Sequence, residues 1–389
     1  MSELYTEKLK PLSQTRGELF ISRITSNCLL PEAARSRNIL LVTQPLQKVP
    51  HGFDAVIVLQ KNVDFLPEEA EFPDNLLVVA DDQSFLGDGD VVRLNPNSLT
   101  LHTMYRKNSS HNSLLVTERC NHYCLMCSQP PREIDDGYIV DDLFKAIPLM
   151  SRETREIGIT GGEPTLLGAR FVQLLSMLKN YLPSTGIHVL TNGRTFSSRR
   201  FVEKVAALDC KDLMFGIPIY SDVSHLHNYV VQAENALDQT IKGILNLKTY
   251  RQKVEIRVVI HKQTYERLPQ LAEFIVRNLL FVDHVALMGL EMMGFTKTNI
   301  DELWIDPAEY QDQLRKALRT LSSAKIRVSV YNHQLCLLDR ELWPFSVKSI
   351  SDWKNEYMEE CAPCSEKQRC GGFFSSAKFR YSDNIQPIR

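Results

Sequence analysis

The feature that most constrains the fold is a regular alternation of strand-like and helix-like segments from residue 113 onward. The expected strands lie at 113–118, 156–160, 187–191, 212–220, 254–260 and 283–290, and the expected helices at 140–150, 169–182, 198–208, 236–250, 266–280 and 307–323. Strand–helix units in series predict an α/β fold with a parallel sheet that is buried on both sides. Such a sheet is either open and doubly wound or curled into a partial barrel.

Two regions of different character flank this alternation. Residues 1–105 contain short β-like runs at 38–44, 54–60, 75–81 and 90–94, which predict a small N-terminal α/β or mainly β domain. After the last expected helix, residues 326–332 predict one more strand, followed by a loop-rich segment with four cysteines. We therefore divide the chain into an N-terminal domain (1–105), a core (106–323) and a C-terminal region (324–389).

Composition excludes several classes of protein. Hydrophobic residues make up 43% and charged residues 24% of the 389 residues, which is typical of a globular chain and not of a disordered one. The net charge of −2 gives no electrostatic reason to expect nucleic acid or an anionic membrane as a partner. The longest apolar run, 284–295, is shorter than the ~20 residues of a membrane-spanning helix, and residues 1–20 lack the apolar segment of a secretory signal. These features predict a cytoplasmic protein.

The nine cysteines are unevenly distributed. Seven of them lie in two regions, 120–127 and 336–370, whereas Cys28 and Cys210 stand alone and receive no role. An odd number of cysteines in a cytosolic chain does not predict disulfides, because that compartment keeps thiols reduced. Clustering of this kind indicates that the cysteines bind a metal ion or an iron–sulfur cluster.

The first group is Cys120, Cys124 and Cys127, directly after the first core strand. Three thiolates on a cubane iron–sulfur cluster bind three irons and leave the fourth iron free for another ligand. A structural zinc ion would instead require a fourth protein ligand, for which His122 is a candidate. Three unrelated buried cysteines are the remaining alternative.

The second core strand ends in a glycine-rich turn, Gly161-Gly162-Glu163-Pro164. Two glycines at the carboxyl end of a parallel strand allow a ligand to approach the main chain, and ligands of α/β folds bind at that edge. A pair of glycines alone also fits an ordinary turn. Their position one strand–helix unit after the cysteines favours a ligand site.

Together, the Cys120/Cys124/Cys127 motif, the turn at 161–164 and Thr191-Asn192-Gly193 resemble the radical S-adenosylmethionine (SAM) superfamily over roughly residues 113–300. The resemblance implies a partial (β/α)6 TIM-like barrel with a [4Fe-4S] cluster on the three cysteines and SAM on the free iron. It further implies that an electron from an external donor cleaves SAM to methionine and a 5′-deoxyadenosyl radical, which abstracts hydrogen from a substrate.

The same resemblance supplies candidates for binding SAM. They are Met126, at the position that usually holds an aromatic residue and offers its main chain to the adenine, and Gly161, Gly162, Glu163, Asn192, Ser221 and Arg257 at successive strand ends. Arg257 has an alternative role as the partner of a structural carboxylate. If the glycine turn serves SAM alone, replacing Gly162 by Val weakens SAM binding and leaves the cysteine site intact. A purely structural turn predicts a protein that loses its cluster.

The second group is Cys336, Cys361, Cys364 and Cys370, followed by two glycines. Four thiolates complete a site for zinc or for a fully ligated [4Fe-4S] cluster, and the spacing does not separate these two. The pattern resembles the C-terminal SPASM and twitch domains of radical SAM enzymes, which implies one auxiliary [4Fe-4S] cluster in preference to zinc. His225, His227 and Glu291, which follow core strands, are weaker candidates for substrate contact; a solvated loop and a structural ion pair are the alternatives.

The segments at 120–132, 331–345, 349–357 and 370–378 resemble radical SAM maturases of the His-Xaa-Ser repeat system, of the HxsC type. That resemblance implies a ribosomally made peptide or small protein as the substrate and a second radical SAM maturase as a partner. Residues 1–105 fit a module that guides the substrate or docks a partner. Two other interpretations stay open: a radical SAM enzyme acting on a small molecule or nucleotide, and a zinc-binding structural or interaction protein.

Overall fold

The computed structural model describes residues 6–68, 72–348 and 356–389. The chain divides into two compact units, one of residues 1–114, 137–157 and 173–185, and the other of residues 115–136, 158–172 and 186–389. The start of the expected polar N-terminus (1–5) and residues 349–355 of the HxsC-like segments lie outside the described residues. Among the described residues, no helix has both the length and the apolar character needed to cross a bilayer.

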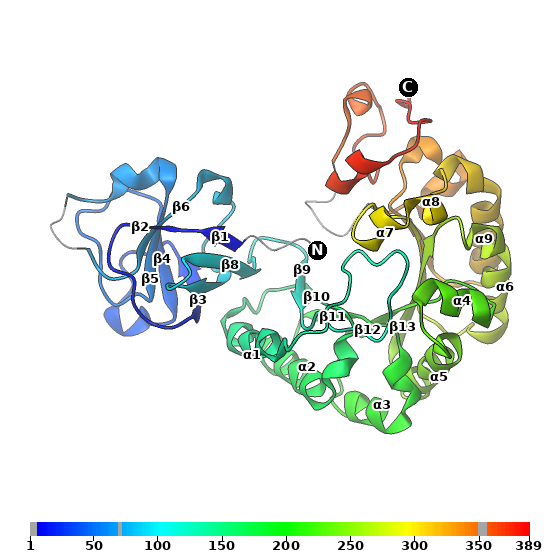
Figure 1. Cartoon of the computed structure of the whole chain (residues 1–389), viewed down its shortest axis with the longest axis horizontal. Helices are drawn as coiled ribbons and strands as arrows, with labels where there is room; N and C mark the ends of the chain where they lie inside the picture. The colour runs from blue at the N-terminus through cyan, green and yellow to red at the C-terminus, as the bar shows by residue number, and fades with distance from the viewer. Residues whose placement is uncertain (1–5, 69–71, 349–355) are drawn as a thin grey trace. The chain divides into compact units, whose positions relative to one another are not determined.

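The first unit contains a mixed eight-stranded sheet (Figure 1). Its strands, in spatial order, are β1 (Thr6–Lys8), β8 (Thr100–Tyr105), β7 (Val91–Asn95), β3 (Phe20–Thr25), β4 (Asn38–Val42), β5 (Ala55–Leu59), β6 (Leu76–Val79) and β2 (Lys10–Pro11). Strands β3 to β6 pair in parallel, and the strands beyond them on both sides pair antiparallel. The four strands expected in this region are confirmed as β4, β5, β6 and β7.

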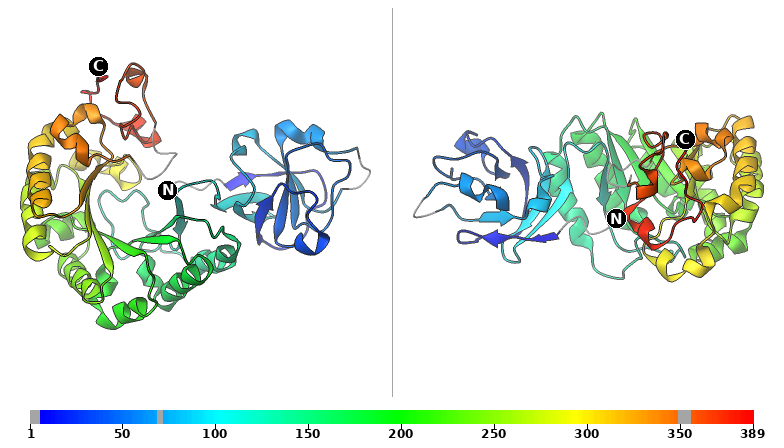
Figure 2. Two further views of the ribbon diagram at one scale, coloured as in Figure 1. Left: turned by 180° about the vertical axis from the view of Figure 1, so that it is seen from behind. Right: turned by 90° about the horizontal axis from the view of Figure 1, so that it is seen from above.

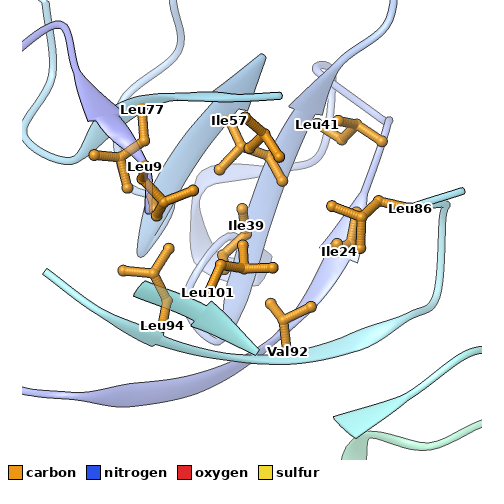
Figure 3. Close-up of a cluster of buried hydrophobic side chains, with 12 residues drawn as sticks. Leu9, Ile24, Ile39, Leu41, Ile57, Leu77, Leu86, Val92, Leu94 and Leu101 are labelled. Atoms are coloured by element: carbon orange, nitrogen blue, oxygen red, sulfur yellow. The ribbon is translucent and has the colours of Figure 1, made fainter. Parts of the chain in front are cut away.

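Both faces of this sheet are buried, because alternate residues of its central strands enter two hydrophobic clusters. Ile39, Leu41 and Ile57 belong to the cluster shown in Figure 3, whereas Leu40 and Val56 belong to the cluster on the other face. Each of these side chains is at most 4% exposed. The short continuous apolar runs of these strands are therefore buried because each face of the sheet packs against its own apolar layer.

The second sheet has the linear order β15-β14-β13-β12-β11-β10-β9. Its strands are β9 (Asn112–Leu115), β10 (Glu156–Thr160), β11 (Gly186–Leu190), β12 (Leu213–Pro218), β13 (Lys253–Ile260), β14 (His284–Gly289) and β15 (Val328–Tyr331). From β11 to β15 every neighbouring pair is parallel. The sheet is curled, and helices lie outside the curve (Figures 1 and 2). The predicted α/β fold with a partial barrel is confirmed, including the strand expected at 326–332.

The helices of the core alternate with these strands as expected. They are α1 (Gly137–Ala146), α2 (Ala169–Tyr181), α3 (Arg199–Ala206), α4 (Ser224–Val231), α5 (Ala236–Thr249), α6 (Leu268–Asn278), α7 (Phe295–Thr298), α8 (Ile300–Leu303) and α9 (Gln311–Ser323). Helix α4 corrects the interpretation of 224–228 as a possible solvated loop. It forms because Val230, Val231 and His227 pack into the core, a tertiary effect that outweighs the weak helix propensity of the segment.

The C-terminal region after β15 is built from short 3₁₀ turns. They include η9 (Leu335–Leu337), η10 (Arg340–Phe345), η12 (Glu359–Cys361) and η13 (Ser375–Phe379). An antiparallel bridge joins Glu356 to Phe373, and a parallel bridge joins Ser346 to Val330 of β15. The region is thus loop-rich, as its sequence predicts, and it carries the second group of cysteines.

Candidate functional site

The cysteine loop is attached by its main chain to the glycine turn after β10. The amide of Val116 donates to Thr160 O at 2.9 Å, and the amide of Gly162 donates to Thr117 O at 2.8 Å. The amide of Glu163 donates to Arg119 O, also at 2.8 Å. The turn therefore extends strand-like pairing into the segment that leads directly to Cys120.

This attachment explains both glycines. A Cβ atom on Gly161 would lie 2.4 Å from Thr117 O. A Cβ atom on Gly162 would lie 2.1 Å from Arg119 O and 3.0 Å from the Cβ of Cys120. This geometry argues against the expectation that Gly162→Val leaves the cysteine site intact, because a side chain at 162 would displace the main chain that leads to Cys120.

The carboxylate of Glu163 joins two strand ends. It is fully buried and accepts hydrogen bonds from the amide of Thr165 (3.0 Å), the hydroxyl of Thr191 (2.7 Å) and the amide of Asn192 (2.6 Å). Burial raises the pKa of Glu163, and these hydrogen bonds oppose that rise. Asn192 extends the connection, since its amide donates to Asn121 Oδ1 at 2.6 Å. Glu163 and Asn192 thus lie beside the cysteine loop with their side chains engaged by protein partners.

The three thiols of the loop lie close enough to affect one another's pKa. Burial first, and then the charges of Glu163 and Cys127, raise the pKa of Cys120 to about 12. Burial, then Cys127 and Cys120, raise the pKa of Cys124 above its usual value. Three thiolates this close repel each other without a cation, and a cationic metal centre removes that repulsion. The donor set therefore fits an iron–sulfur cluster held by three cysteines.

His122, the candidate fourth ligand for zinc, lies between Cys120 and Cys124 in the sequence and is buried in the structure. Burial lowers its pKa to about 3, and neither ring nitrogen has a hydrogen-bond partner in the described part of the chain. Among residues 6–68, 72–348 and 356–389, no three Cys, His, Asp or Glu side chains are grouped closely enough to hold a single metal ion.

The other side of the cysteine loop contacts the segment after β14. Phe295 donates its amide to Cys127 O at 2.9 Å, and Asn299 donates to Leu125 O at 2.9 Å. Thr296 donates its hydroxyl to Met126 O at 3.3 Å. A Cβ atom on Gly294 would lie 2.3 Å from Cys127 O, so this position also requires glycine. Sequence reasoning missed these residues; the glycine after two methionines was their one detectable signal.

The Met126 side chain points into the core. It is 7% exposed and packs with Tyr220, Val230 and Val231. The pKa of Tyr220 is raised well above its usual value, first by burial and then by the charges of Cys124 and Cys127. The effect of these two cysteines means that Tyr220 lies near their thiols. Tyr220 carries no motif signal in the sequence.

The two remaining candidates for binding SAM, Ser221 and Arg257, interact with neighbouring residues of the protein. Ser221 is fully buried, and its hydroxyl accepts a hydrogen bond from the amide of Val223 at 3.1 Å. Arg257 on β13 pairs with Glu255 at 2.6 Å and donates to the sulfur of Met288 at 3.3 Å. The structural alternative for Arg257, pairing with a carboxylate, is therefore present.

Glu255 is the centre of a buried polar network inside the barrel. Its second oxygen lies 2.7 Å from His284 Nδ1, whose Nε2 lies 3.0 Å from the hydroxyl of Ser329. Although burial opposes ionisation, the hydrogen bond from His284 and the charge of Arg257 lower the pKa of Glu255 to about 2. The network keeps a charged pair in the barrel interior beneath the strand ends.

The two histidines of α4 have different surroundings. His227 is 1% exposed, and its Nδ1 accepts the main-chain amide of Tyr220 at 3.2 Å. Burial lowers the pKa of His227 to about 4, so the ring is neutral at physiological pH. His225 is exposed. His227 thus supports the end of β12.

The second group of cysteines shares one cavity of about 330 Å³, part of it open to solvent. Cys336 comes from η9, directly after β15, and Cys361, Cys364 and Cys370 come from the loops beyond. The amides of Leu335 and Gly372 point at the sulfur of Cys370, at 3.4 and 3.5 Å. Four thiols around one cavity, with amides aimed at sulfur, supply the donor set of a fully ligated cluster, whereas in the described residues they are not grouped closely enough to hold a single metal ion.

A larger cavity, about 650 Å³ and open on one side, lies at the ends of β14 and β15. Its walls include Leu290, Glu291 and Met292 on one side and Gly371 to Phe374 on another, with the aromatic side chains of Trp304 and Tyr381. The first wall continues into Gly294, which contacts Cys127, and the second begins next to Cys370. The cavity therefore borders the segment that follows Cys370 and the segment that leads to Gly294, the residue that lies against Cys127.

Comparison with known proteins agrees with this arrangement. Residues 114–275 match the family model of the radical SAM superfamily. The chain is 25% identical over 203 residues to the tungsten-containing aldehyde ferredoxin oxidoreductase cofactor-modifying protein of Pyrococcus furiosus, covering 50% of this chain and 54% of that protein. The chain thus spans about half the length of the curated relative that it matches.

Two solved structures are also similar. Native anSMEcpe with bound AdoMet has a TM-score of 0.51 and 12% identity, covering 71% of this chain and 92% of that one. Streptococcus suis SuiB bound to S-adenosylmethionine has a TM-score of 0.47 and 18% identity, covering 58% and 51%. The likeness to anSMEcpe shows a shared fold.

Proposed function

We propose that the chain, whose residues 114–275 match the radical SAM superfamily model, is an enzyme that cleaves SAM reductively at Cys120, Cys124 and Cys127. The observation that carries this proposal is the attachment of the cysteine loop to the glycine turn, in which Gly162 and Glu163 donate their amides to Thr117 O and Arg119 O. A zinc-binding structural protein gives no reason for that close main-chain approach at a strand end.

In this proposal the three thiolates hold a [4Fe-4S] cluster, which supplies the open iron and the electron for SAM when it is bound. Gly161 and Gly162 present main-chain carbonyls at the strand end. Glu163 and Asn192 act as positioning residues, because their buried hydrogen bonds fix the turn and the loop against each other. Met126 offers its main chain, while its side chain anchors the loop in the core. Ser221 after β12 and Arg257 on β13 are the proposed contacts to the ribose or carboxylate of SAM, and each exchanges a present protein partner to make that contact.

The four C-terminal cysteines are proposed to hold an auxiliary [4Fe-4S] cluster. Their common cavity and the amides directed at Cys370 support this assignment. Hydrogen bonds from amides to cluster sulfurs are a usual means of setting the potential of such centres. Zinc is the alternative occupant.

For the substrate we propose a ribosomally made peptide or small protein of the His-Xaa-Ser repeat type. The cavity at the ends of β14 and β15 supports a peptide substrate, because it lies next to Cys370, shares the segment that leads to Gly294 beside Cys127, and has aromatic walls that suit side chains. A second radical SAM maturase and an external electron donor complete the proposed system, which operates in the cytoplasm. A small-molecule substrate is the second candidate, favoured by the cofactor-modifying role named for the Pyrococcus furiosus relative.

The test of the substrate is direct. Reduced, iron-loaded protein is incubated with SAM and a synthetic peptide of His-Xaa-Ser repeats, with a peptide of scrambled repeats as the control. The proposal expects a mass change in the repeat peptide alone. Formation of 5′-deoxyadenosine with no change in either peptide would remove the peptide assignment and leave the radical SAM assignment in place.

A further inference from the structure

The segment 382–388 is held at both ends by groups on other elements. The hydroxyl of Ser382 donates to the carboxylate of Asp306 at 2.7 Å, and the side-chain amide of Asn384 donates to the same oxygen at 3.3 Å. Four residues further on, Ile388 O accepts hydrogen bonds from the amide and the hydroxyl of Ser365, at 2.9 and 3.0 Å. The segment is therefore fixed where it leaves the barrel and again beside Cys364.

Between these two anchors the segment crosses the four-cysteine cavity. Gln386, Pro387 and Ile388 line the cavity together with the four thiols. Gln386 lines this cavity together with Cys336, and most of residue 386 is exposed to solvent. We therefore take the main chain of residue 386, and not its side chain, to be the part that faces Cys336.

The geometry has two consequences for a cluster on these thiolates. An amide hydrogen bond to a coordinating sulfur stabilises the reduced, more negative state and raises the reduction potential. Chain packed over the cavity limits the access of water and oxidants to the cluster. The hydrogen bonds of Ser382 and Asn384 to Asp306 at one end, and of Ser365 to Ile388 O at the other, hold this cover in place.

We propose that residues 382–388 form a strap that closes the four-cysteine site, with the Gln386 main-chain amide as an outer hydrogen-bond donor to Cys336. This inference rests on the proposed function, because it needs a cluster on the four cysteines. It adds a residue that no cysteine or glycine motif identifies. It also gives Cys336 a donor of its own, alongside the two amides that serve Cys370.

The experiment uses full-length protein in which Cys120, Cys124 and Cys127 are Ala, so that the auxiliary cluster is observed alone. Gln386→Pro removes the amide hydrogen, and Gln386→Ala is the matched control that keeps it. Redox titration followed by electron paramagnetic resonance gives the midpoint potential, and iron release to a chelator gives the lifetime of the cluster. The strap predicts a lower potential and at least several-fold faster iron release for Gln386→Pro, with Gln386→Ala unchanged.

A second measurement uses the unaltered chain, so its result does not depend on whether the Gln386→Pro variant folds. Hydrogen–deuterium exchange of the peptide that contains Gln386 is compared in iron-loaded and iron-free protein. The strap predicts protection of this amide that is reduced on iron removal. Equal exchange in both forms, or equal potentials and lifetimes for the Pro and Ala variants, would overturn the strap alone. Protein that binds no iron at these four cysteines would overturn the auxiliary cluster and the strap together, while cleavage of SAM by the unaltered chain would still stand.

Discussion

Replacing Gly162 by Ala tests how closely the glycine turn and the cysteine loop are packed. The added Cβ would lie 2.1 Å from Arg119 O and 2.5 Å from Arg119 C, so main chain must retreat by about 1 Å to reach ordinary contact. Overpacking of this kind costs about 1–3 kcal/mol, and the upper end is expected because both contacting atoms belong to the main chain. Since Cys120 follows Arg119 directly, the shift also moves the first thiolate.

The assay combines iron analysis with urea unfolding of iron-free protein. Gly162→Ala is expected to lower the free energy of unfolding by about 2–3 kcal/mol and to reduce iron from about eight toward about four per chain, by cubane stoichiometry. Gly87→Ala is the control, because its Cβ would meet only Asn108 Nδ2 at 3.7 Å; its effect is expected to stay within about 1 kcal/mol. A Gly162→Ala protein with full iron and unchanged stability would refute the packing argument.

Three further predictions follow from the site. Glu163→Gln places a side-chain amide among the donors of Thr165, Thr191 and Asn192, so the free energy of unfolding in urea is expected to fall by about 1–3 kcal/mol. Glu203 is exposed, and Glu203→Gln is the control that is expected to stay near wild type. Equal effects of the two substitutions would show that the buried hydrogen bonds of Glu163 do not stabilise the site. In the folded protein the pKa of Glu255 is lowered to about 2 from the usual 4.5, so Glu255 contributes stability above pH 4.5 that is lost as pH falls toward 2. The loss is at most about 3 kcal/mol, and a Glu255→Gln protein with the same acid unfolding profile as wild type contradicts the assignment. Cys336→Ala is expected to lower iron at the auxiliary site and leave the first site loaded, whereas Cys28→Ala changes neither; full iron in Cys336→Ala would show that the other three cysteines suffice.

The sequence predicts the parallel core well, because buried parallel strands are continuous apolar runs that periodicity detects. Strand β8 was missed for the complementary reason: it has no continuous apolar run, because buried Leu101, Thr103 and Tyr105 alternate with half-buried residues of mixed polarity. Helix α4 was missed because its formation depends on packing of His227, Val230 and Val231, which no local pattern reports.

In the candidate site, too, local patterns in the sequence were detected and contacts that depend on packing were not. Spacing identifies the cysteines and the glycine turn because the motif itself is local. Gly294, Thr296 and Asn299 contact the cysteine loop across about 170 residues of sequence, and Glu255 meets His284 and Ser329 from neighbouring strands. Such contacts depend on the register of the folded sheet, so a single sequence does not contain them in readable form.

The central claim is that Cys120, Cys124 and Cys127 hold the cluster at which SAM is cleaved. The most direct measurement is the 5′-deoxyadenosine formed when reduced, iron-loaded protein is mixed with SAM without oxygen. Wild-type protein is expected to release it, Cys124→Ala to release none, and Cys361→Ala to retain some cleavage, because only the first site has an open iron. Iron-loaded wild-type protein that forms no 5′-deoxyadenosine, or a Cys124→Ala protein that forms as much as wild type, would contradict the account.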